Sequence, residues 1–454
     1  MKKSPPMRSE AERTSTLRFT ATVLLFLAAY ALAQADKQVV GLLVQPIQRT
    51  FGISDTAVGL LQGVGFALAF AIGGLPLARL VDGGHRVRIA AACVATWSLA
   101  TLLCGLANGF LFLFFARMLT AVAEAGLAPA FFSLLSQETD QRRILRTTSI
   151  FMLGPFIGGG LILILGGLFL RWADNADVTF GIWSSPWRMM FLAVGLPGLI
   201  VALLMLLFAN EKPRIVKPQN LQPFSEVLRR IFSESALLRT YFTALLLFTI
   251  PLYAIMAWYP TLLIRDYGMS VGQSGPLAGS IYLVAGSLGT FAVSLGASRY
   301  SYSLSRMMTI YTAAALLLCI ILSIAAFSPT ASVSLICYGV YSFLAATILA
   351  SMAVPVQLVL PQPMVGRGIA ILIFVTSATS GSLGPLLVGA ATDQLGVSLQ
   401  IALFLISACA VMASALIFWR ARRHAGIWEN LQAEAAIETA YSSSGQMPSI
   451  GGNC

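Results

Sequence analysis

Hydrophobic residues along this chain of 454 residues are gathered into twelve long runs that short polar segments separate. An α-helix needs about 20 apolar residues to cross a hydrocarbon core that is roughly 30 Å thick. Each run reaches or exceeds that length, so we predict an all-α polytopic membrane protein with twelve transmembrane helices. The predicted spans are 17–45, 54–80, 87–107, 110–136, 146–170, 187–209, 239–264, 271–298, 303–327, 331–360, 364–392 and 398–420.

The longest polar segment, 210–238, divides the spans into two sets of six. Its second part has apolar residues at helical spacing, Val227, Leu228, Ile231 and Phe232, which predicts an amphipathic helix on the membrane surface; a plain linker is the alternative. We therefore predict five regions. These are an N-terminal tail (1–16), a six-helix bundle (17–209), the linker (210–238), a second six-helix bundle (239–422) and a polar, disordered C-terminal tail (423–454).

The two halves also resemble each other in sequence. Gly154-Pro155 followed by Gly158-Gly159 in the fifth span is similar to Gly384-Pro385 followed by Gly389 in the eleventh. Repeated halves around a central site are a common plan of secondary transporters.

Basic residues predict the orientation of the spans. When both termini are placed in the cytoplasm, most of the 29 Lys and Arg residues fall on the cytoplasmic side. Arg49, Arg171, Arg188 and Arg265 fall on the other side, and Lys37 and Arg117 lie within spans. Because cytoplasmic loops are enriched in Lys and Arg, this asymmetry predicts cytoplasmic termini.

Composition excludes several classes of function. The chain is 57% hydrophobic and 10% charged, whereas a soluble domain has about a quarter charged residues. The net charge of +11 follows from the loops that flank the spans, so we expect no nucleic-acid partner. The cysteines show no paired spacing and both histidines lie in charged flanks, so no metal site is predicted. The sequence also lacks a recognisable set of nucleophile and base, so we do not expect an enzyme.

Four charged residues lie inside spans and are the candidate site. Asp36 and Lys37 are in the first span, and Arg117 and Glu124 are in the fourth, seven residues apart and therefore on one helix face. At 1.5 Å per residue, Asp36 is about 13 Å from the outer, non-cytoplasmic end of its span. Counted from the same side, Arg117 is about 10 Å deep and Glu124 about 20 Å deep, so the depth of Asp36 lies between theirs. A structural ion pair is one interpretation; a site that binds and releases protons is the other.

The loop after the second span, with Arg79, Asp82 and Arg86, resembles the signature loop of the major facilitator superfamily, although it also fits simple anchoring by basic residues. Other segments resemble Spinster-type transporters of that superfamily. They include Asp36-Lys37, 51–56, Ala116-Arg117, Glu124-Ala125-Gly126, 186–188, 195–198 and 384–389. The resemblance implies two six-helix bundles, alternating access, proton coupling through Asp36, Glu124, Arg117 and Lys37, and a cytoplasmic gate at Arg79, Asp82 and Arg86. Lys37 and Gly83 depart from the family pattern, which has Arg at both positions.

The second half has no charge within a span, and its candidate cavity residues are aromatic or hydroxylated. These are Tyr253, Trp258, Tyr282, Tyr338, Tyr341, Thr376 and Ser377. A cavity that is charged on one side and aromatic on the other suits an amphipathic substrate. We therefore expect a monomeric inner-membrane transporter of lysolipid- or sphingoid-like lipids, which exports them, uses the proton gradient and has no cofactor. A proton-coupled symporter of small organic anions is the alternative, and a membrane sensor or scramblase is a third.

Overall fold

The computed structural model describes residues 10–82, 85–135, 147–148, 150–176, 185–209, 223–297 and 303–444, and over these residues all regular structure is helical. Twelve helical segments of the described chain are long and apolar enough to cross a membrane. The predicted fold class, an all-α protein with twelve spans, is therefore confirmed.

The first six spans form one bundle, here called the N-bundle. Its elements are α1 (Glu10–Phe51), α2 (Asp55–Gly59), the π-helical turn η1 (Leu60–Gly65), α3 (Phe66–Asp82), α4 (Arg86–Gly105), α5 (Phe110–Glu124), α6 (Leu127–Leu135), α8 (Gly154–Ala176) and α9 (Pro186–Phe208). The second span thus consists of α2, η1 and α3, and the fourth consists of α5 and α6.

The last six spans form the C-bundle, which follows the short linker elements α10 (Phe224–Arg229) and η2 (Arg230–Glu234). Its elements are α11 (Ala236–Arg265), α12 (Val271–Ala297), α13 (Leu304–Ala326), α14 (Ala331–Ser351), α15 (Val354–Val359), α16 (Gln362–Val375), the π-helical turn η3 (Thr376–Ser380), α17 (Gly381–Leu395) and α18 (Leu399–Ser444).

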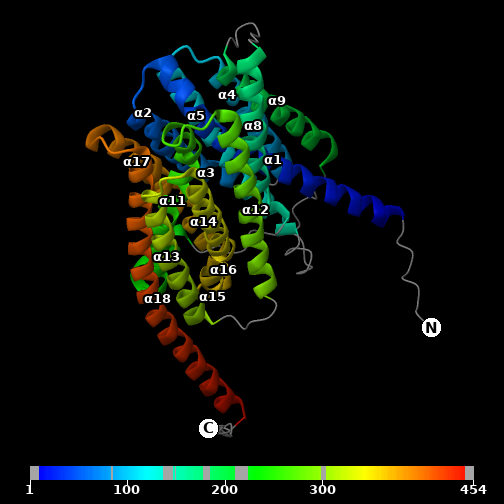
Figure 1. Ribbon diagram of the computed structural model, residues 1–454. Helices are drawn as coiled ribbons and strands as arrows, with labels where there is room; N and C mark the ends of the chain where they lie inside the picture. The colour runs from blue at the N-terminus through cyan, green and yellow to red at the C-terminus, as the bar shows by residue number, and fades with distance from the viewer. Residues whose placement is uncertain are drawn as a thin grey trace, which may run out of the picture.

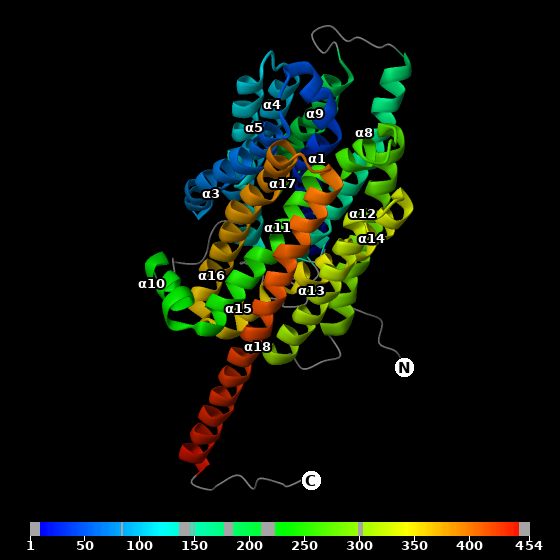
Figure 2. The same ribbon diagram turned by 60° about the vertical axis from the view of Figure 1, so that its left-hand side comes forward.

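The two bundles lie side by side and touch along three pairs of spans (Figures 1 and 2). The fifth span (α8) packs on the eighth (α12), the first (α1) on the seventh (α11), and the second (α2, η1 and α3) on the eleventh (η3 and α17). We call the end of the molecule at which α1, α11 and α17 finish the distal end; it is at the top of both figures, opposite the C-terminus.

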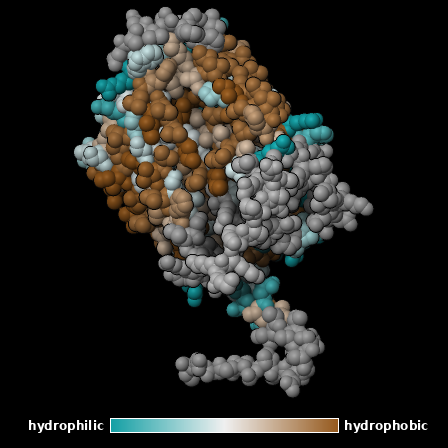
Figure 3. Space-filling model, turned by 90° about the vertical axis from the view of Figure 1, so that its right-hand side faces the viewer, coloured by the Kyte–Doolittle hydropathy of each residue, from teal (hydrophilic) through white to brown (hydrophobic). Residues whose placement is uncertain are grey.

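The outward surface of the bundles is apolar, as a hydrocarbon solvent requires. Ile72, Phe115, Leu207 and Ile310 are all exposed although they are large hydrophobic residues. Figure 3 shows one side of this surface, on which hydrophobic side chains cover the middle and hydrophilic ones gather near the edges. In a membrane these side chains contact lipid tails, so their exposure to the surroundings carries no penalty.

The repeated glycines in the two halves pack equivalent helices together. Gly158 on α8 lies against the Ala31 carbonyl of α1, where a methyl group would overlap the oxygen atom. In the C-bundle, a methyl group at Gly384 on α17 would lie 2.6 Å from the Ile250 carbonyl oxygen of α11. The fifth span therefore packs on the first as the eleventh packs on the seventh, which explains why the halves share small residues at these places.

The linker and the C-terminal segment differ in part from the expectation. The linker does form a helix, with Val227 and Ile231 buried against the core, but Leu228 is 41% exposed. The segment after Arg423 was expected to be disordered, and that expectation is wrong up to Ser444, because α18 continues to this residue. Figures 1 and 2 show this part of α18 projecting beyond the bundles.

We predict that Gly158→Ala lowers the thermal stability of the protein in detergent. The added methyl group forces α8 away from α1, and overpacking of this kind costs about 1–3 kcal/mol. Gly426→Ala on α18 is the matched control, because nothing lies within 4 Å of its added methyl group. Thermal unfolding of both variants checks this; an unchanged unfolding temperature for Gly158→Ala would mean that α8 shifts at no cost.

Candidate functional site

Two ion pairs join α1 to α5 in the interior of the N-bundle. Arg117 pairs with Asp36, and Lys37 pairs with Glu124 across 2.9 Å. Residues 36 and 37 are neighbours on a helix, so their side chains project about 100° apart and reach different partners. The structure therefore brings together all four residues that the sequence nominated.

The pair of Asp36 and Arg117 is fully buried and well bonded. Asp36 is 1% exposed, Arg117 donates a hydrogen bond to its Oδ2, and the hydroxyl of Thr101 on α4 donates to its Oδ1 at 2.7 Å. The Thr101 hydroxyl has one proton and also lies 2.9 Å from the Trp97 carbonyl oxygen. The charged acceptor makes the stronger bond, so Asp36 receives donors on both of its oxygen atoms.

The pair of Lys37 and Glu124 is less well bonded. The Glu124 side chain is 1% exposed and the Lys37 side chain is 20% exposed. Beyond this ion pair, neither oxygen of Glu124 has a hydrogen-bond partner among the described residues. In the described part of the chain Lys37 is the cation within ion-pair distance of Glu124, and it is the member of the pair that other molecules can reach.

The helix that carries Glu124 ends at this residue. Ala125 and Gly126 form a turn, and α6 begins at Leu127. A methyl group at Gly126 would lie 2.6 Å from the sulfur atom of Cys93, so a larger side chain there requires Cys93 to move. The break within the fourth span therefore places a carboxylate at an interruption of the helix, as discontinuous helices of transporters do.

Aromatic rings cover both cations. The Lys37 ammonium lies 5.5 Å from the ring centre of Phe66 and 5.1 Å from that of Phe70, and the Arg117 guanidinium lies 5.1 Å from Phe66. Contacts of this geometry attract cations and exclude water at once. Phe66 therefore contacts the cation of each ion pair.

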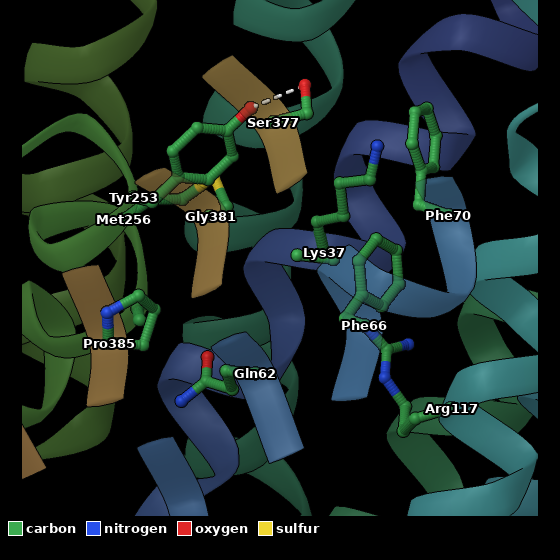
Figure 4. Close-up of a pocket in the computed structure, with 12 residues that line it drawn as sticks. Lys37, Gln62, Phe66, Phe70, Arg117, Tyr253, Met256, Ser377, Gly381 and Pro385 are labelled. Carbon is green, nitrogen blue, oxygen red and sulfur yellow. Dashed lines mark hydrogen bonds between the residues drawn. The ribbon is translucent and has the colours of Figure 1, made fainter. Parts of the chain in front are cut away.

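A cavity of about 60 Å³ lies between the bundles beside these pairs (Figure 4). Its cations, Lys37 and Arg117, come from the N-bundle, and no charged residue of the C-bundle is among its lining residues. On the C-bundle side, the Tyr253 hydroxyl donates a hydrogen bond to Ser377 at 3.1 Å. The remaining lining residues are Gln62, Phe66, Ala67, Phe70, Met256, Ala257, Gly381 and Pro385.

Of the seven cavity residues predicted in the second half, Tyr253 and Ser377 line this cavity. Trp258 is buried and its Nε1 donates to the Pro385 carbonyl oxygen at 3.0 Å, and the Thr376 hydroxyl donates to the Leu372 carbonyl oxygen at 2.8 Å.

The other three predicted residues lie away from the cavity lining. Tyr282 packs on Phe156 with ring centres 5.4 Å apart, and Tyr338 stacks on Tyr259 with ring centres 4.0 Å apart. Tyr341 is buried, and its hydroxyl has no hydrogen-bond partner among the described residues. A role for these residues in substrate binding stays a prediction.

Sequence reasoning missed one polar group of the cavity, Gln62. Its amide nitrogen is buried and has no hydrogen-bond partner among the described residues, so it is free to donate to a bound molecule. Gln62 lies on η1 and Ser377 on η3, so both π-helical turns present a polar residue to the cavity. A single Gln in an otherwise apolar span was the signal available, and π-helical turns often occur at functional sites.

The structure describes the side chains of two of the three residues predicted to form a cytoplasmic gate. Arg79 is exposed, Arg86 is 1% exposed, and the Asp82 side chain lies outside the residues whose burial is described. No group of three or more potential metal ligands occurs in the described part of the chain.

Known proteins with similar sequences are transporters. An MFS-type efflux pump of Mycolicibacterium smegmatis is 26% identical over 423 residues, which cover 90% of this chain and 94% of that protein. A gallate transporter of Pseudomonas putida is 26% identical over 293 residues, covering 57% of this chain and 61% of that protein.

A similar fold occurs in a solved bacterial homologue of the human lysosomal transporter Spinster, in an inward-facing and occupied conformation. Its TM-score is 0.70 at 21% identity, with 93% of this chain and 98% of that chain covered. The family model of the Major Facilitator Superfamily matches residues 26–381, which is most of the chain. With its two six-helix bundles and the cavity between them, the chain belongs to the Major Facilitator Superfamily of membrane transporters.

Proposed function

We propose that this protein is a Spinster-type, proton-coupled secondary transporter of amphipathic lipids, which works by alternating access. The observation that carries the proposal is the pairing of Glu124 with Lys37. A deeply buried carboxylate is balanced by a cation that also faces the cavity between the bundles. Buried ionisable groups within membrane spans mark proton and substrate pathways.

The two ion pairs have different tasks in this proposal. Asp36 keeps Arg117 and Thr101 as partners and fixes α1 against α4 and α5. Among the described residues Glu124 forms its ion pair with Lys37, so an acidic group of the substrate that binds Lys37 takes this partner from Glu124. A buried carboxylate without a counterion is costly, and a proton neutralises it. Binding of the substrate to Lys37 therefore promotes binding of a proton to Glu124.

The charge of the substrate head decides the direction of coupling. An acidic head, such as the phosphate of a lysolipid, takes Lys37 and promotes protonation of Glu124, so that substrate and proton travel together. A cationic head, such as a sphingoid amine, pairs with Glu124 and competes with the proton, as the expected export requires. The cations on the cavity wall favour an acidic head, and measured proton flux with each substrate distinguishes the two.

The cavity supports an amphipathic molecule rather than a doubly charged one. All of its charge lies on the N-bundle side, while Tyr253, Met256 and Ala257 of α11 form an apolar and aromatic wall. Its volume of about 60 Å³ has room for roughly five water molecules, enough for a head group but not for a lipid tail. We infer that the tail lies between the bundles and that they separate to admit it.

Orientation follows from the basic residues. With both termini in the cytoplasm, the distal end faces the other side of an inner membrane. Alternating access then opens the cavity to the cytoplasm when the distal ends touch, and to the other side when they part. This arrangement needs no second copy of the chain, so we propose that the monomer is the working unit.

Proton-coupled symport of small organic anions is the second candidate. The small cavity with two cations favours it, and the relatives of this chain include the gallate transporter and putative tartrate transporters of Agrobacterium vitis. The uncharged C-bundle wall counts against it, because a small acid bound between two bundles gains most from cations on both sides.

Glu124→Gln is expected to abolish transport driven by a pH gradient while leaving substrate binding and exchange largely intact, because the amide keeps the shape but cannot take up a proton. Uptake into proteoliposomes with and without a pH gradient measures both. Glu226→Gln in the linker is the control and should transport normally. A Glu124→Gln protein that still concentrates its substrate would show that the proton binds elsewhere.

Arg117→Lys is expected to damage the protein more than Lys37→Arg. Arg117 binds a buried carboxylate, and a lysine there cannot offer the planar donor group of a guanidinium. Loss of a partner from a buried pair costs about 3–5 kcal/mol, and a lysine should recover only part of this. Lys37 borders the cavity, where a larger cation has space. Thermal unfolding and transport at matched expression compare the two; a functional Arg117→Lys beside an inactive Lys37→Arg would assign the anchoring role to the wrong residue.

Purified protein should be stabilised against heat by lysolipids more than by small organic acids. A ligand that binds only the folded state raises the unfolding temperature, and the rise grows with the ratio of ligand concentration to Kd. Lysolipids of one tail length with different heads separate the contribution of head charge from detergent-like effects. Selective stabilisation by gallate or tartrate, with none by any lysolipid, would favour the second candidate.

A further inference from the structure

A cluster of polar residues joins the two bundles at the distal end, away from the ion pairs of the cavity. At its centre Asp55, the first residue of α2, is 6% exposed. Arg265, the last residue of α11, binds it with two nitrogen atoms, at 2.6 Å to Oδ2 and 3.0 Å to Oδ1. This is the paired geometry in which Arg and a carboxylate bind most strongly and most directionally.

Further donors complete the bonding of Asp55. Gln48 at the end of α1 donates to Oδ1 at 2.7 Å and accepts from Arg265 at 3.1 Å, while the Thr392 hydroxyl of α17 donates to Oδ2 at 2.9 Å. The carboxylate thus receives hydrogen bonds from α1, α11 and α17. The bonds from Arg265 and Thr392 exist only while the two bundles touch.

A second acid makes the reciprocal contact from the C-bundle. Asp393 of α17 accepts hydrogen bonds from the backbone N–H of Thr56 at 2.7 Å and from its hydroxyl at 2.6 Å. Both donors belong to the first turn of α2, whose backbone N–H groups have no partner within the helix. Each bundle therefore contributes one carboxylate that the other bundle binds.

The backbones beneath this cluster are in direct contact. A methyl group at Gly59 would lie 2.7 Å from the Pro385 carbonyl oxygen, and one at Gly389 would overlap the Asp55 carbonyl. Pro385 also lines the cavity, as does Gln62 on the adjoining turn η1. Separation of α2 from α17 at the cluster therefore moves two walls of the cavity as well.

We propose that Gln48, Asp55, Thr56, Arg265, Thr392 and Asp393 form a distal latch, whose strength sets the resting balance between molecules that are closed and molecules that are open at this end. Water replaces the bonds to both carboxylates in the open form, so loss of Arg265 strands Asp55 only in the closed form. The latch involves none of the residues that we assign to the substrate or the proton. It therefore goes beyond the proposed function and can be tested without a substrate.

The test measures the distance between spin labels at the distal end by double electron–electron resonance. The labels are attached to cysteines at Thr50 on α1 and Gln394 on α17, both exposed, after replacement of the native cysteines. The parent protein should give mainly the short distance of the touching bundles. Arg265→Ala should add a longer distance and raise the ratio of open to closed molecules roughly tenfold or more, the usual size of a charge-assisted contact.

Arg49→Ala is the control, because it removes an exposed arginine from the same end of the molecule. The exchanged pair Asp55→Arg with Arg265→Asp should recover part of the short-distance population. If Arg265→Ala does not fold, Thr56→Val and Thr392→Val carry the test, since each removes one hydroxyl and keeps all charges. In each of these two variants the ratio of open to closed molecules should rise about threefold, as expected for the loss of one hydrogen bond. Distances that stay at the parental value in every variant that folds would overturn the latch.

Discussion

The structure depends on one requirement, that charges placed within hydrocarbon must meet an opposite charge. Arg117 and Asp36 meet this requirement completely, and by doing so they fix α1 against α5 in the middle of the N-bundle. Once this contact is made, Lys37 must point about 100° away from it, toward the cavity and Glu124. The strong pair therefore determines where the weaker pair lies. A site that binds and releases protons needs such a division, because a carboxylate with several donors has no reason to change its partner.

Small residues and π-helical turns make this arrangement possible. Gly158 lets α8 approach the backbone of α1 near the charged residues, and Gly59 lets α2 approach α17 across the bundle interface. The turns η1 and η3 interrupt the second and eleventh spans beside the cavity, and they present Gln62 and Ser377 to it. A π-helical turn is less stable than an α-helical one, so these are the places where the spans can change shape at the lowest cost.

The number of spans and the common depth of the four charges followed from the sequence, because length, apolar content and helical rise determine both. The choice of partners did not follow. Asp36 and Lys37 are adjacent and both reach α5, so the sequence left open which residue of α5 each of them would meet. Trp258 and Thr376 show the same limit, since a helix has several faces and sequence alone does not say which one borders the cavity.

Arg265 shows how an exception to a sequence rule gains meaning from the fold. It is one of four basic residues that the predicted orientation leaves on the non-cytoplasmic side, and in sequence nothing distinguishes it from the other three. Its partner Asp55 is 210 residues away, at the start of α2 in the other bundle. The packing of the two bundles brings the two residues together. Contacts between the halves are the least visible in sequence, because they join residues that are far apart in the chain.

The distal latch and the ion pairs of the cavity act on the same equilibrium from two places. A ligand shifts a conformational balance only by the difference between its affinities for the two states. To open a strong latch, the proton or substrate must therefore bind the cavity of the open form much more tightly than that of the closed form. Glu124 is suited to provide this difference, because the residue that pairs with it in the described part of the chain also lines the cavity between the bundles. The two sites are linked: a change in the latch alters the fraction of molecules in each state, and with it the apparent affinity of the cavity for any proton or substrate that binds one state more tightly. The bonds at the distal end thus belong to the energetics of transport although they touch neither the proton nor the substrate.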